Sequence, residues 1–129
     1  IANQSPFRLS QEMISDKLNM NGRDIFDFTT RTVANSLDKF LGEAKDSVDY
    51  FLLHQANVRI LDIMAKKLKV DRAKFLQNME YYGNSSAASI PLLLSESVEK
   101  GTIKIGSKQK LVFSGFGGGL SYGHILTTI

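Results

Sequence analysis

The chain of 129 residues contains no cysteine and only two histidines, His54 and His124. The absence of cysteine excludes disulfide bonds, zinc sites built on thiolates and a cysteine nucleophile within this chain. The two histidines do not form a closely spaced ligand pair, so a metal site would have to depend on carboxylates. We therefore expect neither a disulfide framework nor a metal site.

The sequence also lacks a long hydrophobic run. Its longest apolar stretches, such as residues 90–94, span only a few residues, whereas a membrane-spanning helix needs about 20. The first residues contain no basic leader, no apolar stretch and no initiator methionine. The sequence therefore reads as one that starts inside a longer protein, not as one that starts with a signal peptide. We expect a cytoplasmic protein that does not enter a membrane.

Charge is only mildly unbalanced, because Lys and Arg number 16, Asp and Glu number 13, and the formal net charge is +3. Hydrophobic residues make up 43% of the chain and charged residues 22%, which is typical of a folded chain with room for one core but not two. The basic residues gather in and just after one predicted helix: Arg59, Lys66, Lys67, Lys69, Arg72 and Lys74.

Such a basic run is usually a solvated helix face. The functional alternative is a docking site for an acidic protein or a phosphate group. No aromatic residues interleave these charges, so we do not expect nucleic-acid binding.

Hydrophobic periodicity predicts three long helices. Apolar residues recur at helical spacing over residues 23–41, which precede Gly42, and again over residues 56–70. A third helix is expected over residues 85–100, capped by Ser85 or Ser86 and ended by Gly101. Residues 1–20 lack a clear period and are expected to form an irregular lead-in, with a short helix at residues 10–18.

Strand signals alternate with these helices. Residues 48–53 are rich in β-branched and aromatic residues, which indicates a strand buried on both faces. Further strands are expected at residues 76–80, 110–114 and 122–128, the last two antiparallel and joined by the glycine-rich residues 115–119. The order helix, strand, helix, strand, helix, strand, strand predicts an α/β domain over residues 21–129. Its sheet should be mixed and mostly parallel, with helices packed on it.

Three features each follow a predicted strand: His54, Asn84 and the glycine segment. Because ligands bind at the carboxyl ends of the strands in such sheets, we expect these features to converge. An imidazole and a carboxamide aimed at one point would form a donor pair suited to a developing enolate oxygen. Each feature also has a structural alternative: a hydrogen-bonded histidine at a strand end, an asparagine in a turn, and a tight strand connection.

The glycines do not form a nucleotide-binding motif. Read from Gly115, the G-x-G-x-x-G pattern would need a glycine at Leu120, and the segment leads into a strand, not a helix. The segment from Gly101 to Lys108 has the glycine spacing of a P-loop, but Ser107 precedes the lysine where the motif requires the reverse order.

Three segments carry a family resemblance: residues 54–60 (HQANVRI), residues 82–91 (YGNSSAASIP) and residues 116–119 (FGGG). Together, and in this order, they closely resemble signature segments of the 3-oxoacyl-(acyl-carrier-protein) synthase III family, within the thiolase-like superfamily. The turn and helix start at residues 21–26 (NGRDIF) are also similar. The resemblance runs from about Met20 to the end, and the residues before it match only loosely.

The resemblance implies that this chain is the carboxy-terminal half of a duplicated fold whose amino-terminal half supplies a nucleophilic cysteine. We favour a truncated chain over a subunit completed by a partner. The implied activity is decarboxylative Claisen condensation of malonyl-ACP with an acyl thioester, in fatty acid or related polyketide biosynthesis. The implied enzyme is a homodimer that needs no cofactor, because its substrates are carried on CoA and acyl carrier protein. The fragment alone is expected not to condense.

The resemblance also assigns roles residue by residue. It implies that His54 and Asn84 bind the thioester carbonyl of the malonyl group and stabilise the enolate formed as CO2 leaves. Gly118 would offer a backbone N–H to the oxyanion hole. Asn57 and Phe116 would contact the CoA or pantetheine arm.

Arg59 matches the carrier-protein docking arginine of the family, and Lys66 and Lys67 would extend the basic surface.

The alternative function is a non-catalytic module of the same fold that binds a carrier protein. Ser85 and Tyr122 depart from the more usual threonine and tryptophan, which leaves the acyl-chain preference open. We also expect an exposed apolar face where the missing half and a dimer partner would pack.

Overall fold

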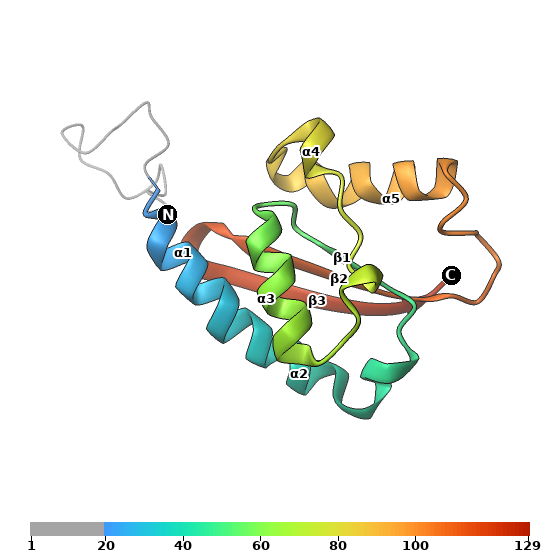
Figure 1. The fold of residues 1–129 in the computed structure, drawn as a ribbon, viewed down its shortest axis with the longest axis horizontal. Coiled ribbons are helices and arrows are strands. Elements are labelled where there is room, and N and C mark those ends of the chain that lie inside the picture. Colours follow the sequence, from blue (N-terminus) through green and yellow to red (C-terminus); the bar gives the residue numbers. More distant parts are fainter. Residues whose placement is uncertain (1–19) are drawn as a thin grey trace.

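A computed structural model describes residues 20–129, which form a mixed three-stranded sheet with helices on both faces (Figure 1). Apart from Met20, the predicted lead-in over residues 1–20 and its helix at residues 10–18 lie outside the described residues. The elements are α1 (Gly22–Phe28), a π-helical turn (Thr29–Val33), α2 (Ala34–Leu41), β1 (Tyr50–Leu53), α3 (Val58–Leu68), α4 (Met79–Tyr82), α5 (Ser89–Glu99), β2 (Lys110–Gly117) and β3 (Ser121–Thr128). Short 3-10 turns occupy Gly42–Ser47, Arg72–Lys74, Ser86–Ala88 and Gly118–Leu120.

The first helical segment runs from Gly22 to Leu41, close to the predicted bounds, and contains one π-helical turn. At this turn the hydroxyls of Thr29 and Thr30 each donate to the carbonyl four residues earlier, both at 2.8 Å. Threonine side chains that bond back in this way loosen the backbone ladder. The segment ends at Gly42, whose φ of +50° suits glycine far better than any other residue.

The sheet has the order β1-β2-β3. β1 pairs with β2 in parallel, with Tyr50 opposite Leu111, and β2 pairs with β3 antiparallel, with Ser114 opposite His124. The predicted mixed α/β architecture is confirmed. The sheet nevertheless contains one parallel and one antiparallel pair, because the strand expected between α3 and α5 does not join it as a full strand.

The prediction of a strand at residues 76–80 was wrong. Only an isolated parallel bridge, between Phe51 and Phe75, remains of it, and the chain turns into α4 from Met79. The reason is visible at Asn78, whose backbone N–H donates to the side chain of Gln55 at 3.1 Å instead of to a neighbouring strand. A side chain that takes a ladder hydrogen bond ends the pairing, which propensity alone does not reveal.

Two apolar clusters pack against the two faces of the sheet. The larger lies between the sheet and helices α2 and α3 and includes Leu37, Phe51 and Met64. The smaller lies on the face covered by α5 and includes Leu52 and Leu93. Consecutive residues of β1 therefore enter opposite clusters, as expected for a strand buried on both faces. The result is a layered arrangement of helices, sheet and helix, seen edge-on in Figure 1.

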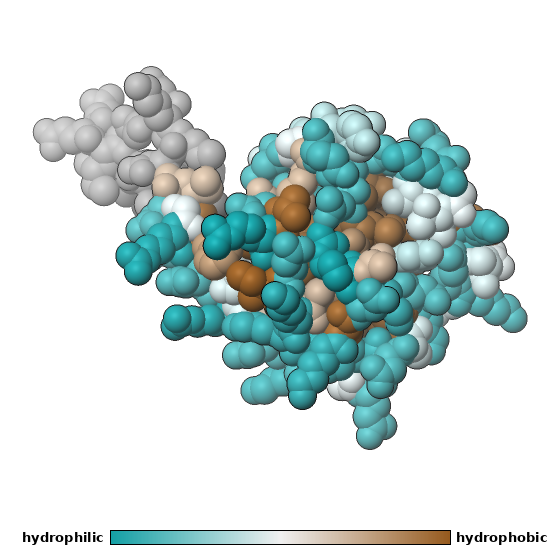
Figure 2. All heavy atoms as spheres, in the orientation of Figure 1, coloured by the Kyte–Doolittle hydropathy of each residue, from teal (hydrophilic) through white to brown (hydrophobic). Residues whose placement is uncertain are grey.

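The strand β3 stays largely exposed, although it carries large apolar side chains. Ile125 is 61% exposed, and Tyr122 and Leu126 are also exposed. This agrees with the expected exposed apolar surface. Figure 2, in the orientation of Figure 1, shows hydrophilic residues around the rim of this view and hydrophobic residues gathered towards its centre, between α3 and α5. No helix within residues 20–129 combines the length and apolar character that crossing a bilayer requires.

Candidate active site

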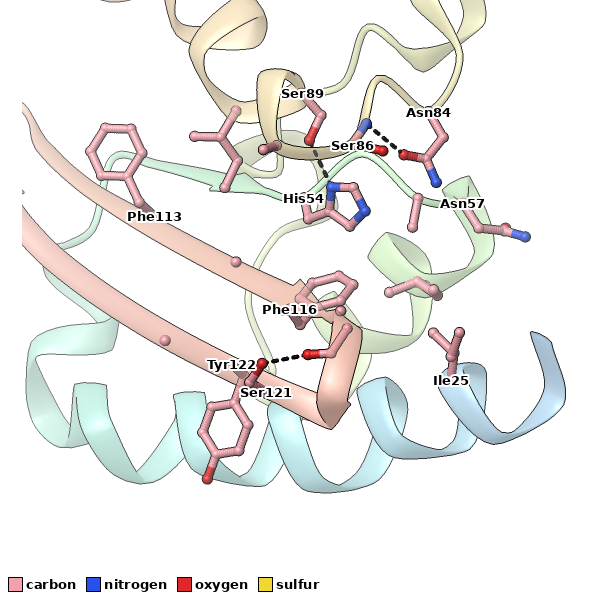
Figure 3. A pocket seen from close by; sticks show the side chains of 18 of the residues that line it. Ile25, His54, Asn57, Asn84, Ser86, Ser89, Phe113, Phe116, Ser121 and Tyr122 are labelled. Atoms are coloured by element: carbon pink, nitrogen blue, oxygen red, sulfur yellow. Dashed lines mark hydrogen bonds between the residues drawn. The ribbon is translucent and has the colours of Figure 1, made fainter. Parts of the chain in front are cut away.

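An open pocket of about 1200 Å³ lies at the carboxyl end of β1, beside the start of α3 (Figure 3). Five residues that the sequence singled out line it: His54, Asn57, Asn84, Phe116 and Gly118. They come from the end of β1, the start of α3, the turn before α5 and the end of the β2–β3 hairpin. The predicted convergence of the histidine, the asparagine and the glycine segment is therefore present in the structure.

His54 is the first residue after β1, and its backbone N–H donates to the Ser114 carbonyl at 2.9 Å. Its side chain is held on two sides: Nδ1 lies 2.7 Å from Ser89 Oγ, and the ring meets Phe116 edge-on at 5.4 Å. Figure 3 shows the other ring nitrogen, Nε2, on the side away from Ser89, towards Asn57 and Asn84. Burial lowers the pKa of His54 below its ordinary value. The imidazole is therefore neutral at neutral pH.

Asn84 lies in the turn after α4, not after a strand as predicted, yet it reaches the same pocket. Its side-chain Oδ1 accepts a hydrogen bond from the Ser86 N–H at 3.0 Å. This bond fixes the amide orientation, because a backbone N–H must face the oxygen. The Nδ2 group, drawn in Figure 3 on the side away from the Ser86 N–H, is left as a donor at the pocket.

The predicted serine caps of the third helix are not formed. Neither Ser85 nor Ser86 makes a side-chain cap bond, and a 3-10 turn precedes α5. The Asn84 side chain takes the capping role in this turn. Asn84 therefore has both features that the sequence suggested: it stabilises a turn, and it lines the pocket.

The glycine segment is partly strand. β2 continues to Gly117, and a 3-10 turn at Gly118–Leu120 leads into β3. The Gly118 carbonyl accepts a hydrogen bond from the Ser121 hydroxyl at 2.6 Å, which holds this peptide in place. Gly119 has φ of +80°, a conformation that residues with a side chain rarely adopt. Glycine is therefore required here for the turn itself.

Asn57 is the N-cap of α3, and its side-chain oxygen accepts the Arg59 N–H at 2.8 Å. The residue is exposed and also lines the pocket. The same helix start therefore contributes both a cap and a pocket group.

The basic residues predicted to dock a carrier protein do not line the pocket. Arg59 is exposed in the first turn of α3, with its guanidinium carbon 5.9 Å from the centre of the Phe26 ring. Lys66 is exposed near the end of α3, and the Lys67 ammonium donates to the Thr30 carbonyl at the π-helical turn. Lys67 thus has a structural partner that the charge pattern did not suggest.

Sequence reasoning missed two side chains at the site. Ser89, in the segment YGNSSAASIP, was expected only as part of a helix, yet it contacts His54. His124 also lines the pocket, with Nδ1 3.0 Å from Ser114 Oγ and Nε2 3.2 Å from Ser36 Oγ. Burial lowers the pKa of His124 as well. Partners so distant along the chain leave no spacing signal in the sequence.

The arrangement suits the stabilisation of a negative oxygen. A neutral imidazole and a carboxamide can each donate one hydrogen bond into a pocket whose walls are mostly apolar. Donors fixed in a partly desolvated site act more strongly on developing charge than the same groups in water. The residues described here that line this pocket include no carboxylate to serve as a general base.

Comparison with known sequences places this site in a family context. The family model described as 3-oxoacyl-[acyl-carrier-protein (ACP)] synthase III C terminal matches residues 39–129. The beta-ketoacyl-[acyl-carrier-protein] synthase III of Enterococcus faecalis is 51% identical over 127 residues, which cover 98% of this chain and 39% of that protein. The synthase III of Streptococcus thermophilus is 54% identical over 125 residues, which cover 97% of this chain and 39% of that protein. The chain thus spans about two fifths of the length of these relatives.

Solved structures give the same result. The beta-ketoacyl-[acyl carrier protein] synthase III of Thermus thermophilus matches with a TM-score of 0.82 and 31% identity, over 100% of this chain and 40% of that one. The 3-oxoacyl-[acyl-carrier-protein] synthase III of Aquifex aeolicus matches with a TM-score of 0.79 and 34% identity, over 86% of this chain and 36% of that one. The chain belongs to the family of carboxy-terminal domains of 3-oxoacyl-[acyl-carrier-protein] synthase III, with the thiolase-like fold.

Proposed function

We propose that this chain provides the enolate-stabilising part of an enzyme that condenses a malonyl thioester with an acyl thioester. One observation carries the proposal: His54 and Asn84 line one pocket, and each is held by a second group so that a donor remains for a ligand. Two directed donors match the single oxygen that gains charge in an enolate. The names of the relatives, beta-ketoacyl-[acyl-carrier-protein] synthase III, support the same reaction class.

In the proposed reaction, the bond between the malonyl carboxylate and the α carbon breaks, and CO2 leaves. The electron pair of the broken bond stays on the malonyl group and forms an enolate. The enolate oxygen accepts hydrogen bonds from His54 and Asn84. The α carbon then attacks the acyl group held as a thioester on a cysteine of the amino-terminal part. The Gly118 N–H donates to the resulting oxyanion, and cleavage of the carbon–sulfur bond releases the 3-oxoacyl thioester and the thiolate.

The thioester substrates would reach the pocket on long, polar arms. Asn57 and Phe116 both line the pocket, which supports our proposal that they contact a pantetheine or CoA arm. The proposal needs no cofactor, because the carbon–carbon bond that breaks as CO2 leaves supplies the electron pair. We further propose a cytoplasmic homodimer acting in fatty acid biosynthesis or a related polyketide pathway. Its partner would be an acyl carrier protein.

Residues 1–129 contain no thiol that could accept an acyl group. We therefore expect this chain by itself not to condense acyl and malonyl thioesters. The proposed condensation requires a further part of the enzyme that supplies the cysteine, outside residues 1–129.

A chimeric enzyme tests the proposal. Residues 1–129 replace the matched part of the Enterococcus faecalis relative, and formation of 3-oxoacyl-ACP from malonyl-ACP and acyl-CoA is measured. The chimera should condense, and His54→Ala or Asn84→Ala should each slow it roughly 100- to 1,000-fold, the usual cost of one oxyanion donor.

Asn35→Ala is the matched control for Asn84, since Asn35 is exposed on α2 and does not line the pocket. It should leave the rate unchanged. A folded chimera whose rate is the same with and without the His54 imidazole would refute the proposed role of the pair.

The second candidate function is docking of an acidic carrier protein without catalysis. It is supported by the exposed Arg59 and Lys66, which lie on the helix that begins at the pocket. The chain should then bind acyl carrier protein more weakly as salt rises. Arg59→Glu should weaken binding further, whereas Lys104→Glu, outside α3, should not. Equal binding by both variants would remove Arg59 from the docking surface.

A further inference from the structure

The side chain of Ser89, the first residue of α5, contacts the imidazole that faces the pocket. Its hydroxyl oxygen lies 2.7 Å from His54 Nδ1, across 35 positions of sequence. Ser89 is only 2% exposed, so water does not compete freely for this hydroxyl. Figure 3 shows the contact as the link between α5 and the end of β1.

The backbone N–H of Gln55 fixes the other side of this hydroxyl. It points at Ser89 Oγ at 3.3 Å. A backbone N–H can only donate, so the serine oxygen accepts this bond and keeps one proton to donate. A buried hydroxyl proton needs an acceptor, because leaving it unpaired costs roughly 1–3 kcal/mol.

Within residues 20–129, His54 Nδ1 is the only acceptor that the Ser89 proton can reach in hydrogen-bond geometry. A helical serine often donates to the carbonyl four residues earlier. Ser97, in the same helix, does so to Leu93 at 2.6 Å. Ser89 makes no such bond in the part of the chain that is described, since its side chain turns to the histidine.

These contacts determine which ring nitrogen carries the proton. If Nδ1 accepts from Ser89, the neutral imidazole must be protonated at Nε2. Nε2 is the nitrogen on the side of Asn84 in Figure 3. The opposite tautomer would present a lone pair to the pocket and would repel an enolate oxygen.

We propose that Ser89 is a positioning residue that holds His54 in the Nε2–H tautomer through the chain Gln55 N–H to Ser89 Oγ–H to His54 Nδ1. The catalytic meaning of this tautomer rests on the proposed function, whereas the tautomer itself does not. No proton changes place in this role: Nε2–H donates a hydrogen bond to the enolate oxygen and keeps its proton. The edge contact with Phe116 holds the ring plane but cannot choose between tautomers.

Nitrogen-15 NMR of the 129-residue chain tests the tautomer directly. With labelled histidine at neutral pH, long-range proton–nitrogen spectra separate protonated from unprotonated ring nitrogens, and His54→Gln assigns the signals of the two histidines. We expect Nδ1 of His54 to be unprotonated in the wild-type chain. A protonated Nδ1 would overturn the proposal.

Substitutions test whether Ser89 selects the tautomer. Ser89→Ala should move both His54 nitrogen shifts towards a mixture of tautomers, and Ser89→Thr, which retains the hydroxyl, should restore them. If the extra methyl group of threonine disturbs folding, the NMR chemical shifts will lose their dispersion. In that case Ser89→Cys supplies a weaker donor of similar size. Ser97→Ala is the matched control, a buried serine of the same helix without contact to His54. Unchanged shifts in a folded Ser89→Ala chain would refute the role of Ser89.

The chimeric enzyme gives the second readout. Ser89→Ala should lower kcat for malonyl-dependent condensation roughly 10- to 100-fold, the cost found for groups that orient histidines in metal sites. KM for the malonyl thioester should change little, and Ser97→Ala should affect neither. A tautomer shift together with unchanged kcat would leave Ser89 as the tautomer partner and would refute the proposed function of His54. Unchanged NMR shifts would refute the inference whatever the rate.

Discussion

The side chain of Gln55 is bonded to the backbone of Asn78, whose N–H donates to Gln55 Oε1 at 3.1 Å. The amide nitrogen of the same glutamine donates to the carbonyl of Leu53 at 2.9 Å. Gln55 is fully buried, so one side chain joins the end of β1 to the segment that leads into α4. Because His54 precedes Gln55, this buried amide also fixes the backbone that carries the imidazole.

Removing this amide should destabilise the domain. Gln55→Met keeps most of the volume but leaves a buried carbonyl and a buried N–H unpaired, at roughly 1–3 kcal/mol each. We therefore expect a loss of roughly 2–6 kcal/mol in the free energy of unfolding, measured by urea denaturation. Gln77→Met, at an exposed glutamine nearby, should stay within about 0.5 kcal/mol of wild type. Similar losses in both variants would contradict the role given to Gln55.

Acidification should destabilise the chain before its carboxylates titrate. Burial lowers the pKa of His54 and His124 below the ordinary 6.5. Between the lowered values and 6.5, the unfolded chain binds more protons than the folded one, so stability rises with pH across this window. The pKa of Glu96 is lowered from 4.5 by its hydrogen bond to Lys100, so its contribution falls away only at still lower pH.

Urea midpoints at about pH 7.5 and about pH 5.5 check this dependence. The wild-type chain should be less stable at the lower pH. Replacing both His54 and His124 by glutamine should flatten the difference. An equally steep dependence in the double variant would show that the histidines do not cause it.

The turn at Gly119 should not accept a side chain. Its φ of +80° places an L-residue in the left-handed region, at a cost of roughly 1–2 kcal/mol. Gly119→Ala should lower the free energy of unfolding by about that amount. Gly22→Ala, in the first turn of α1 with open space around the added carbon, should not destabilise the chain. Equal effects of the two substitutions would argue against conformational strain at Gly119.

The exposed strand β3 should make the isolated chain self-associate. It combines an unpaired edge within the described residues with exposed Ile125 and Leu126, and such edges recruit further strands or apolar partners. Sedimentation velocity over a concentration series should show association that Ile125→Lys reduces. Ile105→Lys, at an exposed isoleucine outside β3, is the matched control. A monomer at every concentration would refute the expectation.

Local sequence patterns were sufficient to predict much of the fold. The helical spacing over residues 23–41 and 56–70 predicted helices close to the observed ones, because apolar residues on one stripe must face the sheet. The segment before His54 predicted a strand buried on both faces, and it is one. The prediction of a strand at residues 76–80 was wrong because the buried side chain of Gln55 accepts a backbone hydrogen bond that a strand would need.

The sequence by itself determined which chemical groups are available: one imidazole after a strand, one carboxamide in a turn, a glycine hairpin and no thiol. Only the tertiary structure decided how these groups are held. Ser89 meets His54 because α5 packs across the end of β1, and Asn84 turns its nitrogen to the pocket because Ser86 occupies its oxygen. Spacing along a chain constrains local conformation, whereas contacts across 35 residues depend on how helices and sheet pack.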